Sequence, residues 1–192
     1  MKTLIRPALS LFVALSVLCG LAYPAFVTVV AQLAFPEAAN GSVVMHHGVA
    51  VGSSLIGQPF QSPAHFWSRP SATSPMPNNG DASSGSNLGP ANPALVDAVK
   101  SRVAALRAAD PGNAAPVPVD LVTASASGLD PHISVASARW QTARVARATG
   151  LPVDRVQALV DRRVEEPWGG WFGQARVNVL LLNLDVDEAR AR

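Results

Sequence analysis

The sequence has 192 residues, enough for one ordinary domain and a short appendage. Its formal charge of +2 comes from Lys2 and Arg6, because the chain from Glu37 onward carries 13 basic and 13 acidic residues. A neutral body gives no compositional support for nucleic-acid binding. The single cysteine, Cys19, excludes an intrachain disulfide and a cysteine metal site.

The first predicted element is a membrane-spanning helix over residues 7–35. No charged residue or histidine occurs between Pro7 and Pro36, and about 20 apolar residues suffice to cross a bilayer. Pro24 interrupts this run, which a membrane helix tolerates where neighbouring groups satisfy the freed carbonyl. The rival interpretation is a cleaved signal peptide. Its apolar core would be shorter, roughly 7–15 residues, and would end in small residues of an Ala-x-Ala type.

The flanking charges predict the orientation of this helix. Lys2 and Arg6 precede it, whereas the next basic residue is Arg69. The positive-inside rule therefore predicts a cytoplasmic N-terminus over residues 1–6 and an extracytoplasmic domain over residues 36–192. We expect a single-pass protein whose helix contacts membrane lipid.

The body combines helical and strand patterns. A hairpin is predicted over 42–56 with Gly48 in its turn, and the stretch 59–93 is either disordered or a binding loop. Periodicity then predicts, in chain order, a helix from Pro93 through Leu106, a strand over 117–123, a helix over 134–150, a helix from Pro152 through Val164, and a strand over 177–184 that is buried on both faces. The fold class is therefore α+β, with one N-terminal transmembrane helix followed by a single mixed globular domain with long irregular loops.

Two motifs resemble phosphate or metal sites but are incomplete. Gly52 and Gly57 have the glycine spacing of a phosphate loop, yet Gln58-Pro59 replaces the lysine and hydroxyl that would reach phosphate and magnesium. A strand and turn explain these residues better. A metal site would have to draw on His46, His47, Asp130 and His132. The adjacent His46 and His47 would point to opposite faces of a strand, and no helical ligand spacing is present. We therefore predict no metal site.

Ser125, Ser127, Asp130 and His132 are the residue types of a nucleophile, a base and an orienting acid. Neither serine lies in a Gly-x-Ser-x-Gly elbow, and the segment is also typical of a turn that enters a helix. A membrane-anchored hydrolase that uses Ser125 or Ser127 with His132 is kept as the alternative function. Our main prediction has no catalytic residue in this chain.

Charged side chains supply two further predictions. Arg139, Arg144 and Arg147 lie on one arc of the helix over 134–150 and form an exposed face, or else bind an acidic partner or an anion. The acidic residues near the C-terminus are interpreted as solvated charge: Glu165, Glu166, Asp185, Asp187 and Glu188.

Six loop phrases carry a family resemblance. They are Gly52-Ser53 through Leu55-Ile56-Gly57-Gln58, Phe66 with Arg69-Pro70-Ser71-Ala72, Gly85-Ser86-Asn87-Leu88-Gly89-Pro90, Val119-Asp120-Leu121-Val122-Thr123-Ala124-Ser125, Ser127-Gly128-Leu129-Asp130-Pro131-His132-Ile133-Ser134, and Arg176-Val177-Asn178-Val179-Leu180 through Asn183. In order and spacing the chain resembles the C subunit family of the bacterial high-affinity potassium-transporting ATPases, from Lys2 to Leu184. Two residues depart from the pattern, since Ser84 and Ala126 stand where the family usually has glycine.

The resemblance implies an accessory, non-catalytic subunit of a complex in the bacterial cytoplasmic (inner) membrane. The implied partners are a potassium-channel-like subunit and a P-type ATPase subunit. The implied role is assembly and stability, and the family is also described as a catalytic chaperone that raises the ATP affinity of the pump subunit. No cofactor is expected to bind tightly, and ATP would act through the pump subunit.

The resemblance also supplies candidate residues. Nucleotide binding would involve Ser125, Ser127, Gly128 and Gln141. Contacts with partner subunits are expected from Arg69, Pro70, Ser71, Asn87, Leu88, Gly89, Pro90, Asp130 and His132. An extracytoplasmic body conflicts with direct contact to cytoplasmic ATP, so a structural subunit that shapes the outer potassium entrance is the favoured interpretation.

Overall fold

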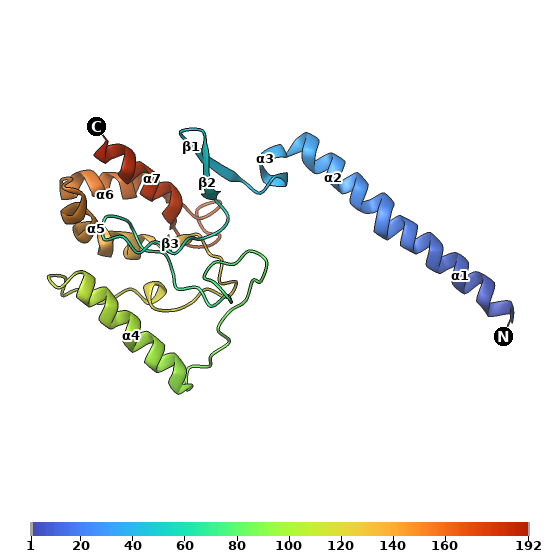
Figure 1. Cartoon of the computed structure of the whole chain (residues 1–192), viewed down its shortest axis with the longest axis horizontal. Coiled ribbons are helices and arrows are strands. Elements are labelled where there is room, and N and C mark those ends of the chain that lie inside the picture. The colour runs from blue at the N-terminus through green and yellow to red at the C-terminus, as the bar shows by residue number, and fades with distance from the viewer. Residues whose placement is uncertain (1, 192) are drawn as a thin grey trace. The chain divides into compact units, whose positions relative to one another are not determined.

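The computed structural model describes residues 2–191, which fall into two compact units divided between Val51 and Gly52. The first unit begins with one continuous helical rod (Figure 1) made of α1 (Lys2–Val17), the π-helical turn η1 (Leu18–Ala22) and α2 (Tyr23–Ala34). In the π-turn the Tyr23 N–H donates to the carbonyl of Leu18, five residues earlier. This wider turn lies directly before Pro24, whose ring and missing N–H disturb a regular α-helix. The proline is thus absorbed without ending the helix.

Within the described residues, one helix is long and apolar enough to cross a membrane. It covers Leu4–Ala34, 31 residues with a mean hydropathy of 2.1. At 1.5 Å per residue this is about 46 Å, more than the roughly 30 Å of hydrocarbon. No part of it is buried by protein. The predicted helix is confirmed in length and composition.

A short helix, α3 (Pro36–Ala39), precedes the hairpin of β1 (Val43–His46) and β2 (Val49–Ser53). The two turn residues His47 and Gly48 have φ of 49° and 78°, as a type I′ turn requires. The predicted hairpin is confirmed, although its second strand ends at Ser53 and not at Ile56.

The second unit is a mixed domain, which confirms the α+β class. Its elements are α4 (Pro93–Ala109), the 3₁₀ turn η2 (Val119–Leu121), β3 (His132–Ser134), α5 (Val135–Thr149), α6 (Val153–Arg162), β4 (Val164–Glu165), β5 (Arg176–Asn178) and α7 (Val179–Arg190). Strands β3 and β4 both pair antiparallel with β5, so that Ile133 and Val164 lie opposite Val177. Helix α5 packs along α6, and α6 packs along α7. Their apolar faces and the sheet share one core, to which α4 contributes Leu106.

The three predicted helices of the body are confirmed, and two have the expected caps. The Asn92 side chain accepts a hydrogen bond from the N–H of Ala94 at the start of α4. The Ser134 hydroxyl accepts from the N–H of Ser137 at the start of α5, and Gly150 ends that helix with φ 75°. These are the positions where capping side chains and glycine stabilise helix ends.

The predicted strand over 117–123 is wrong. The segment forms the 3₁₀ turn η2 instead, because the Asp120 carboxylate holds it at the start of α5. Its oxygens accept hydrogen bonds from the Ser134 N–H and hydroxyl at 2.8 and 3.1 Å and from the Ser137 hydroxyl at 2.5 Å. Proline at position 118 also lacks the N–H that a sheet ladder would use.

The predicted strand over 177–184 is wrong beyond its first residues. Strand β5 ends at Asn178, whose side chain accepts a hydrogen bond from the N–H of Leu181 and so begins α7. The buried residues Val179, Leu182 and Val186 then recur with helical spacing. A short apolar run gives the same pattern for a buried strand and a buried helix, and the Asn178 cap decides between them.

Candidate functional site

The three turn residues predicted to bind nucleotide lie together in one tight turn. The Ser125 hydroxyl accepts a hydrogen bond from the N–H of Gly128 at 2.9 Å, and the Ser127 hydroxyl accepts from the N–H of Leu129 at 3.1 Å. Ser125 is 6% exposed. Both hydroxyls therefore bond to their own turn, which is the local behaviour expected of serine in an irregular segment.

A second loop, residues 71–79, is bonded to this turn. The Ser71 hydroxyl donates to the carbonyl of Gly128 at 2.7 Å, and the Asn78 side chain donates to the same oxygen at 3.3 Å. Gly128 has φ 68°, and a Cβ there would lie 2.6 Å from both the Ser84 carbonyl oxygen and Thr73 Cγ2. Both the backbone conformation and the close approach require glycine at this position. We call residues 71–79 and 124–130 the loop pair.

The two departures from the family pattern lie where chain segments meet at the loop pair. A Cβ on Gly85 would lie 2.7 Å from the carbonyl oxygen of Ala126, so residues 84–85 pass directly over the turn. The Ser83 hydroxyl donates to the carbonyl of Ser127 at 3.0 Å in the same contact. Ser84 and Ala126 contribute backbone atoms to these approaches. Both residues are exposed, so a side chain larger than hydrogen is accommodated at each position.

Arg69, Asp130 and His132, three predicted partner contacts, are brought together at one cleft. Arg69 Nη1 donates to Asp130 Oδ2 at 3.0 Å, and the N–H of His132 donates to Asp130 Oδ1 at 3.0 Å. Burial alone would raise the pKa of Asp130, but hydrogen bonds from His132 and Arg69 lower the pKa to about 2. The carboxylate is therefore ionised at neutral pH.

The cleft has a volume of about 270 Å³ and is lined by charged and polar groups from several segments: Arg69, Asp120, Asp130, His132, Ile133, Ser134, Gln174, Ala175 and Arg176. Glu165 lies next to it, 3.6 Å from Nε2 of His132 and 3.0 Å from the Arg176 side chain. The cleft thus alternates positive and negative charge. Such a surface suits docking to a polar protein surface better than capture of a single anion.

The fourth predicted nucleotide residue, Gln141, lies in the core and is fully buried. Its amide accepts from the N–H of Trp67 at 2.8 Å and donates to the carbonyl of Trp67 at 3.1 Å. Asn183 on α7 does the same for Phe66, at 2.7 and 3.0 Å. The two side chains hold the extended residues Phe66 and Trp67 much as a neighbouring strand would, and we call them the amide clamp.

The amide clamp and Asp120 were missed as structural residues. Asp120 and Asn183 occur in the loop phrases of the resemblance and inside the predicted strands, but the apolar patterns gave neither of them a role. Gln141 was assigned to nucleotide binding. The one available signal was a polar residue within an apolar stripe, since Asn183 stands between Leu182 and Leu184. A buried amide needs partners, and an irregular segment with free backbone groups supplies them.

The predicted exposed arginine face is wrong for Arg144, which is 2% exposed. Its Nη1 donates to the carbonyl of Pro63 at 2.6 Å, its Nη2 donates to Gln141 at 2.7 Å, and its guanidinium lies 4.5 Å from the ring centre of Trp67. Burial lowers the pKa of Arg144 to about 10, so that it remains charged at neutral pH. Helix α5 is covered by the core on its apolar face and by the segment around Pro63 and Trp67 at Arg144. The apolar periodicity of the sequence predicts only the first of these faces.

The other two arginines of the arc have exposed side chains and form ion pairs within the domain. Arg139 pairs with Asp161 at 3.2 Å, and Arg147 pairs with the fully buried Asp110. The Arg139–Asp161 pair is exposed on both sides and contributes little stability, whereas Arg147 supplies the charge partner of a buried carboxylate. They leave the question of an acidic partner untested.

The prediction of solvated carboxylates is wrong for the two aspartates of α7. Asp185 binds the guanidinium of Arg163 through two hydrogen bonds of 2.7 and 2.6 Å, which raises the pKa of Arg163. Asp187 bonds to the imidazole of His65 at 3.0 Å. Two-point arginine–carboxylate pairs fix geometry as well as charge, so these residues attach α7 to its neighbours.

The remaining predicted partner contacts lie at the surface. Asn87, Gly89 and Pro90 are exposed and Leu88 is half-buried, in the segment that leads into α4. Pro70 is half-buried beside Arg69. Asn87 has φ 51°, and the N–H of Asn92 donates to the carbonyl of Gly89. Residues 87–90 therefore present an exposed surface without charged side chains.

The hydrolase alternative receives no support from the geometry. Within residues 2–191 no hydrogen bond joins Ser125 or Ser127 to His132, whose imidazole lies instead near Asp130 and Glu165. A nucleophile and its base need hydrogen-bond contact or one bridging water. The same residues contain no group of three or more His, Cys, Asp or Glu that could hold a metal ion.

These features define a class: a protein with one N-terminal helix long and apolar enough to cross a membrane, and an α+β body with internally bonded loops. The chain belongs to the KdpC family, K+-transporting ATPase, c chain, whose profile matches residues 5–188. It is 65% identical over 187 residues to the potassium-transporting ATPase KdpC subunit of Polaromonas naphthalenivorans, covering 97% of this chain and 95% of that one. It is 63% identical over 191 residues to the subunit of the same name from Variovorax paradoxus, covering 100% and 99%. The resemblance is confirmed, and the chain is a membrane-associated subunit of a potassium-transporting ATPase.

Proposed function

We propose that the chain is a single-pass accessory subunit that stabilises the assembled high-affinity potassium uptake complex from the extracytoplasmic side. Residues 1–6 lie in the cytoplasm, residues 7–35 span the bacterial inner membrane, and residues 36–192 lie outside. The partners are a potassium-channel-like subunit and a P-type ATPase subunit. The chain itself carries out no chemical step.

The loop pair is the observation that carries this proposal. Its polar side chains are bonded to backbone groups of neighbouring segments, as in the 2.7 Å contact from Ser71 to Gly128. A surface whose loops are already fixed loses little conformational entropy on docking. The charged cleft at Arg69 and Asp130 and the exposed segment 87–90 are the surfaces that we assign to the partner subunits.

The catalytic-chaperone role rests on the resemblance alone. A nucleotide at Ser125, Ser127 and Gly128 would compete with the hydrogen bonds that close the turn. At Gln141 it would compete with the backbone of Trp67 in the core. We therefore place ATP on the pump subunit and assign this chain a structural effect on it.

The topology is tested with single cysteines in a Cys19→Ala background. We expect an impermeant thiol reagent applied to intact cells to label Ala114→Cys, an exposed loop position of the body. The matched Thr3→Cys variant should be labelled only after the membrane is permeabilised. Labelling with the opposite pattern would place the body in the cytoplasm, and nucleotide binding would then become the favoured function.

The docking role is tested by co-purification of the other subunits and by growth at micromolar potassium. Pro90→Arg places a bulky charge on the exposed segment before α4, and Pro116→Arg is the matched control on the exposed loop after α4. We expect Pro90→Arg to lower both readouts and Pro116→Arg to leave them unchanged. Full growth and a complete complex in a strain that lacks this chain would contradict the proposed function as a whole.

A further inference from the structure

The segment between β4 and β5 forms a small hairpin that closes on itself. The N–H of Trp168 donates to the carbonyl of Phe172 at 3.1 Å, and the N–H of Phe172 donates back to Trp168 at 3.0 Å. Gly169 and Gly170 turn the chain with φ of 64° and 81°. At its base Glu165 and Arg176 are paired across the strands, with a side-chain contact of 3.0 Å. We call residues 167–173 the aromatic hairpin.

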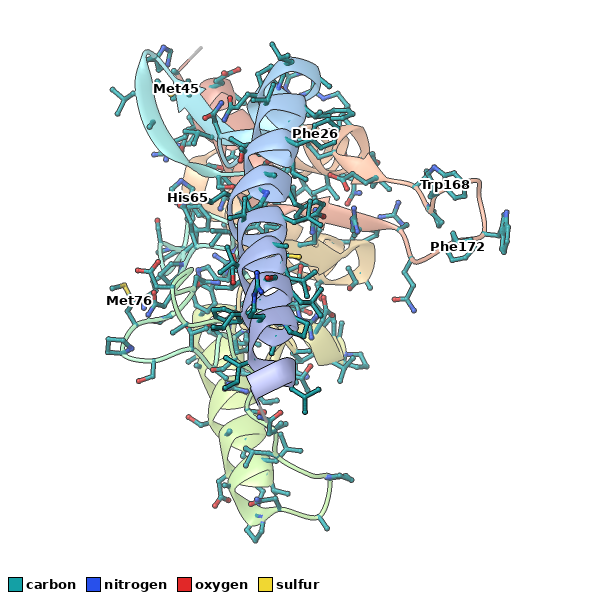
Figure 2. All side chains as sticks on the ribbon, turned by 90° about the vertical axis from the view of Figure 1, so that its right-hand side faces the viewer. Phe26, Met45, His65, Met76, Trp168 and Phe172 are labelled. Carbon is teal, nitrogen blue, oxygen red and sulfur yellow. The ribbon has the colours of Figure 1, made fainter. Side chains whose placement is uncertain are left out.

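The side chains at its tip are large, apolar and uncovered. Trp168 is 78% exposed, Trp171 75% and Phe172 59%, and these are the only exposed aromatic residues among those described beyond Val51. Figure 2 shows Trp168 and Phe172 on a loop that extends away from the rest of the body. The rings contact one another, with centroids 4.6 Å apart for Trp171 and Phe172. They therefore form one patch with no partner in the body.

The chemistry of this patch fits a lipid–water interface. Residues 167–175 contain no charged side chain, so immersion of the tip desolvates no ion. Tryptophan, like tyrosine, is enriched at membrane interfaces, because its ring is apolar and its indole N–H still meets water or headgroups. The hairpin backbone is bonded to itself, so the turn can leave water without freeing the groups that pair Trp168 with Phe172.

We propose that the aromatic hairpin inserts Trp168, Trp171 and Phe172 into the headgroup region of the bilayer that holds the anchor helix. This inference rests on the membrane anchor of the proposed function. Because the anchor and the hairpin belong to one chain, the lipid surface is present at high effective concentration, and a contact that is weak in isolation becomes populated. The chain then has two membrane contacts, a spanning helix and a shallow aromatic one, which restrict the orientation of the body.

The test is photo-crosslinking of the full chain in native membranes, co-expressed with the other subunits. The photoreactive residue p-benzoylphenylalanine replaces Trp171 in one variant. In matched variants it replaces Phe26 in the anchor helix and Val119, which is 70% exposed on the body. After irradiation we expect phospholipid adducts by mass spectrometry at positions 26 and 171, and none at position 119.

Each other outcome has a distinct meaning. Adducts of position 171 with a protein subunit, or with neither lipid nor protein, overturn the inference while lipid adducts at position 26 leave the anchor intact. Loss of lipid adducts at position 26 contradicts the anchor itself. A second measurement removes dependence on the bulky probe: brominated phosphatidylcholine vesicles should quench the tryptophan fluorescence of the reconstituted chain. The Trp168→Phe/Trp171→Phe double variant should lose that quenching, and equal quenching in both chains would overturn the inference.

Discussion

The loop at residues 71–79 and the aromatic hairpin both lack extended secondary structure, yet they differ in what their side chains contact. The polar side chains of the loop bond to the rest of the domain, whereas the aromatic side chains of the hairpin are exposed. In the loop, the hydroxyl of Ser71 and the amide of Asn78 bond inward to the carbonyl of Gly128. In the hairpin the backbone bonds to itself, while the rings of Trp168 and Trp171 are not covered by the rest of the domain. The side chains of an irregular segment can therefore find their partners within the domain, or they can remain exposed and available to a partner outside it. Substitutions in the two classes should differ in their effect on stability.

The amide clamp should give the largest effect. Asn183→Ala removes both hydrogen bonds to the backbone of Phe66, a residue that is fully buried, and leaves an N–H and a C=O without partners. We expect the free energy of unfolding to fall by about 2–4 kcal/mol, since each buried unpaired group costs about 1–3 kcal/mol. Urea unfolding of the full chain in detergent, followed by circular dichroism, measures this loss.

Gln141→Ala should act in the same way through Trp67, and it also removes the acceptor of the buried hydrogen bond from Arg144 Nη2. The control is Gln157→Ala on α6, whose amide donates only to the exposed Asp161. We expect a change below about 0.5 kcal/mol there. Equal losses at positions 141 and 157 would contradict the clamp.

Gly128→Ala should give the next effect, because it opposes the contact between the two members of the loop pair. The new Cβ would lie 2.6 Å from Thr73 Cγ2 in the other loop and 2.6 Å from the Ser84 carbonyl oxygen, at a backbone φ of 68° that disfavours alanine. Strain of this kind costs about 1–3 kcal/mol. Gly89→Ala is the control, since a Cβ there meets nothing within 4 Å. The same unfolding measurement should show a loss at position 128 and almost none at position 89.

The sequence predicted what depends on local pattern and missed what depends on polar contacts between distant segments. Helices α4 and α5 were predicted from their apolar stripes and from Asn92, Ser134 and Gly150 at their ends. The turn of the first hairpin was found through Gly48. Each of these signals lies within a few residues of the element that it defines.

The misses have a common physical origin. The segment around Asp120 forms a 3₁₀ turn and not the predicted strand, because the Asp120 carboxylate accepts hydrogen bonds from Ser134 and Ser137, which lie 14 and 17 residues further along the chain. Arg144 is buried because Pro63, 81 residues earlier, supplies a carbonyl. Pairings at this distance leave no periodic trace in one sequence. Of the candidate site, the resemblance named Arg69, Asp130 and His132, while their meeting at one cleft required the fold.

Asp130 should make stability depend on pH. Its pKa is about 2 in the folded domain against 3.8 for an ordinary aspartate, because hydrogen bonds from His132 and Arg69 outweigh the effect of burial. A lowered folded-state pKa adds stability that is present above the unfolded value and is lost as pH falls from about 4 to about 2. With discount for partial exposure we expect about 1–2 kcal/mol. Asp130→Asn should lose this at neutral pH and match the original chain near pH 2; a constant difference between the two chains would contradict the assignment.

The aromatic hairpin should give the smallest effect on stability, and this is what separates it from the loop pair. Trp171→Ala removes a ring that is 75% exposed and supports nothing in the core, so the free energy of unfolding in detergent should change by less than about 0.5 kcal/mol. Trp140→Ala, at 7% exposure, is the matched control and should cost about 3–5 kcal/mol. A large loss at position 171 would mean that the rings belong to the structure of the body. A negligible loss there, together with lost quenching by brominated lipid in the double variant, would mean that the aromatic rings contact lipid and make no stabilising contact within the body.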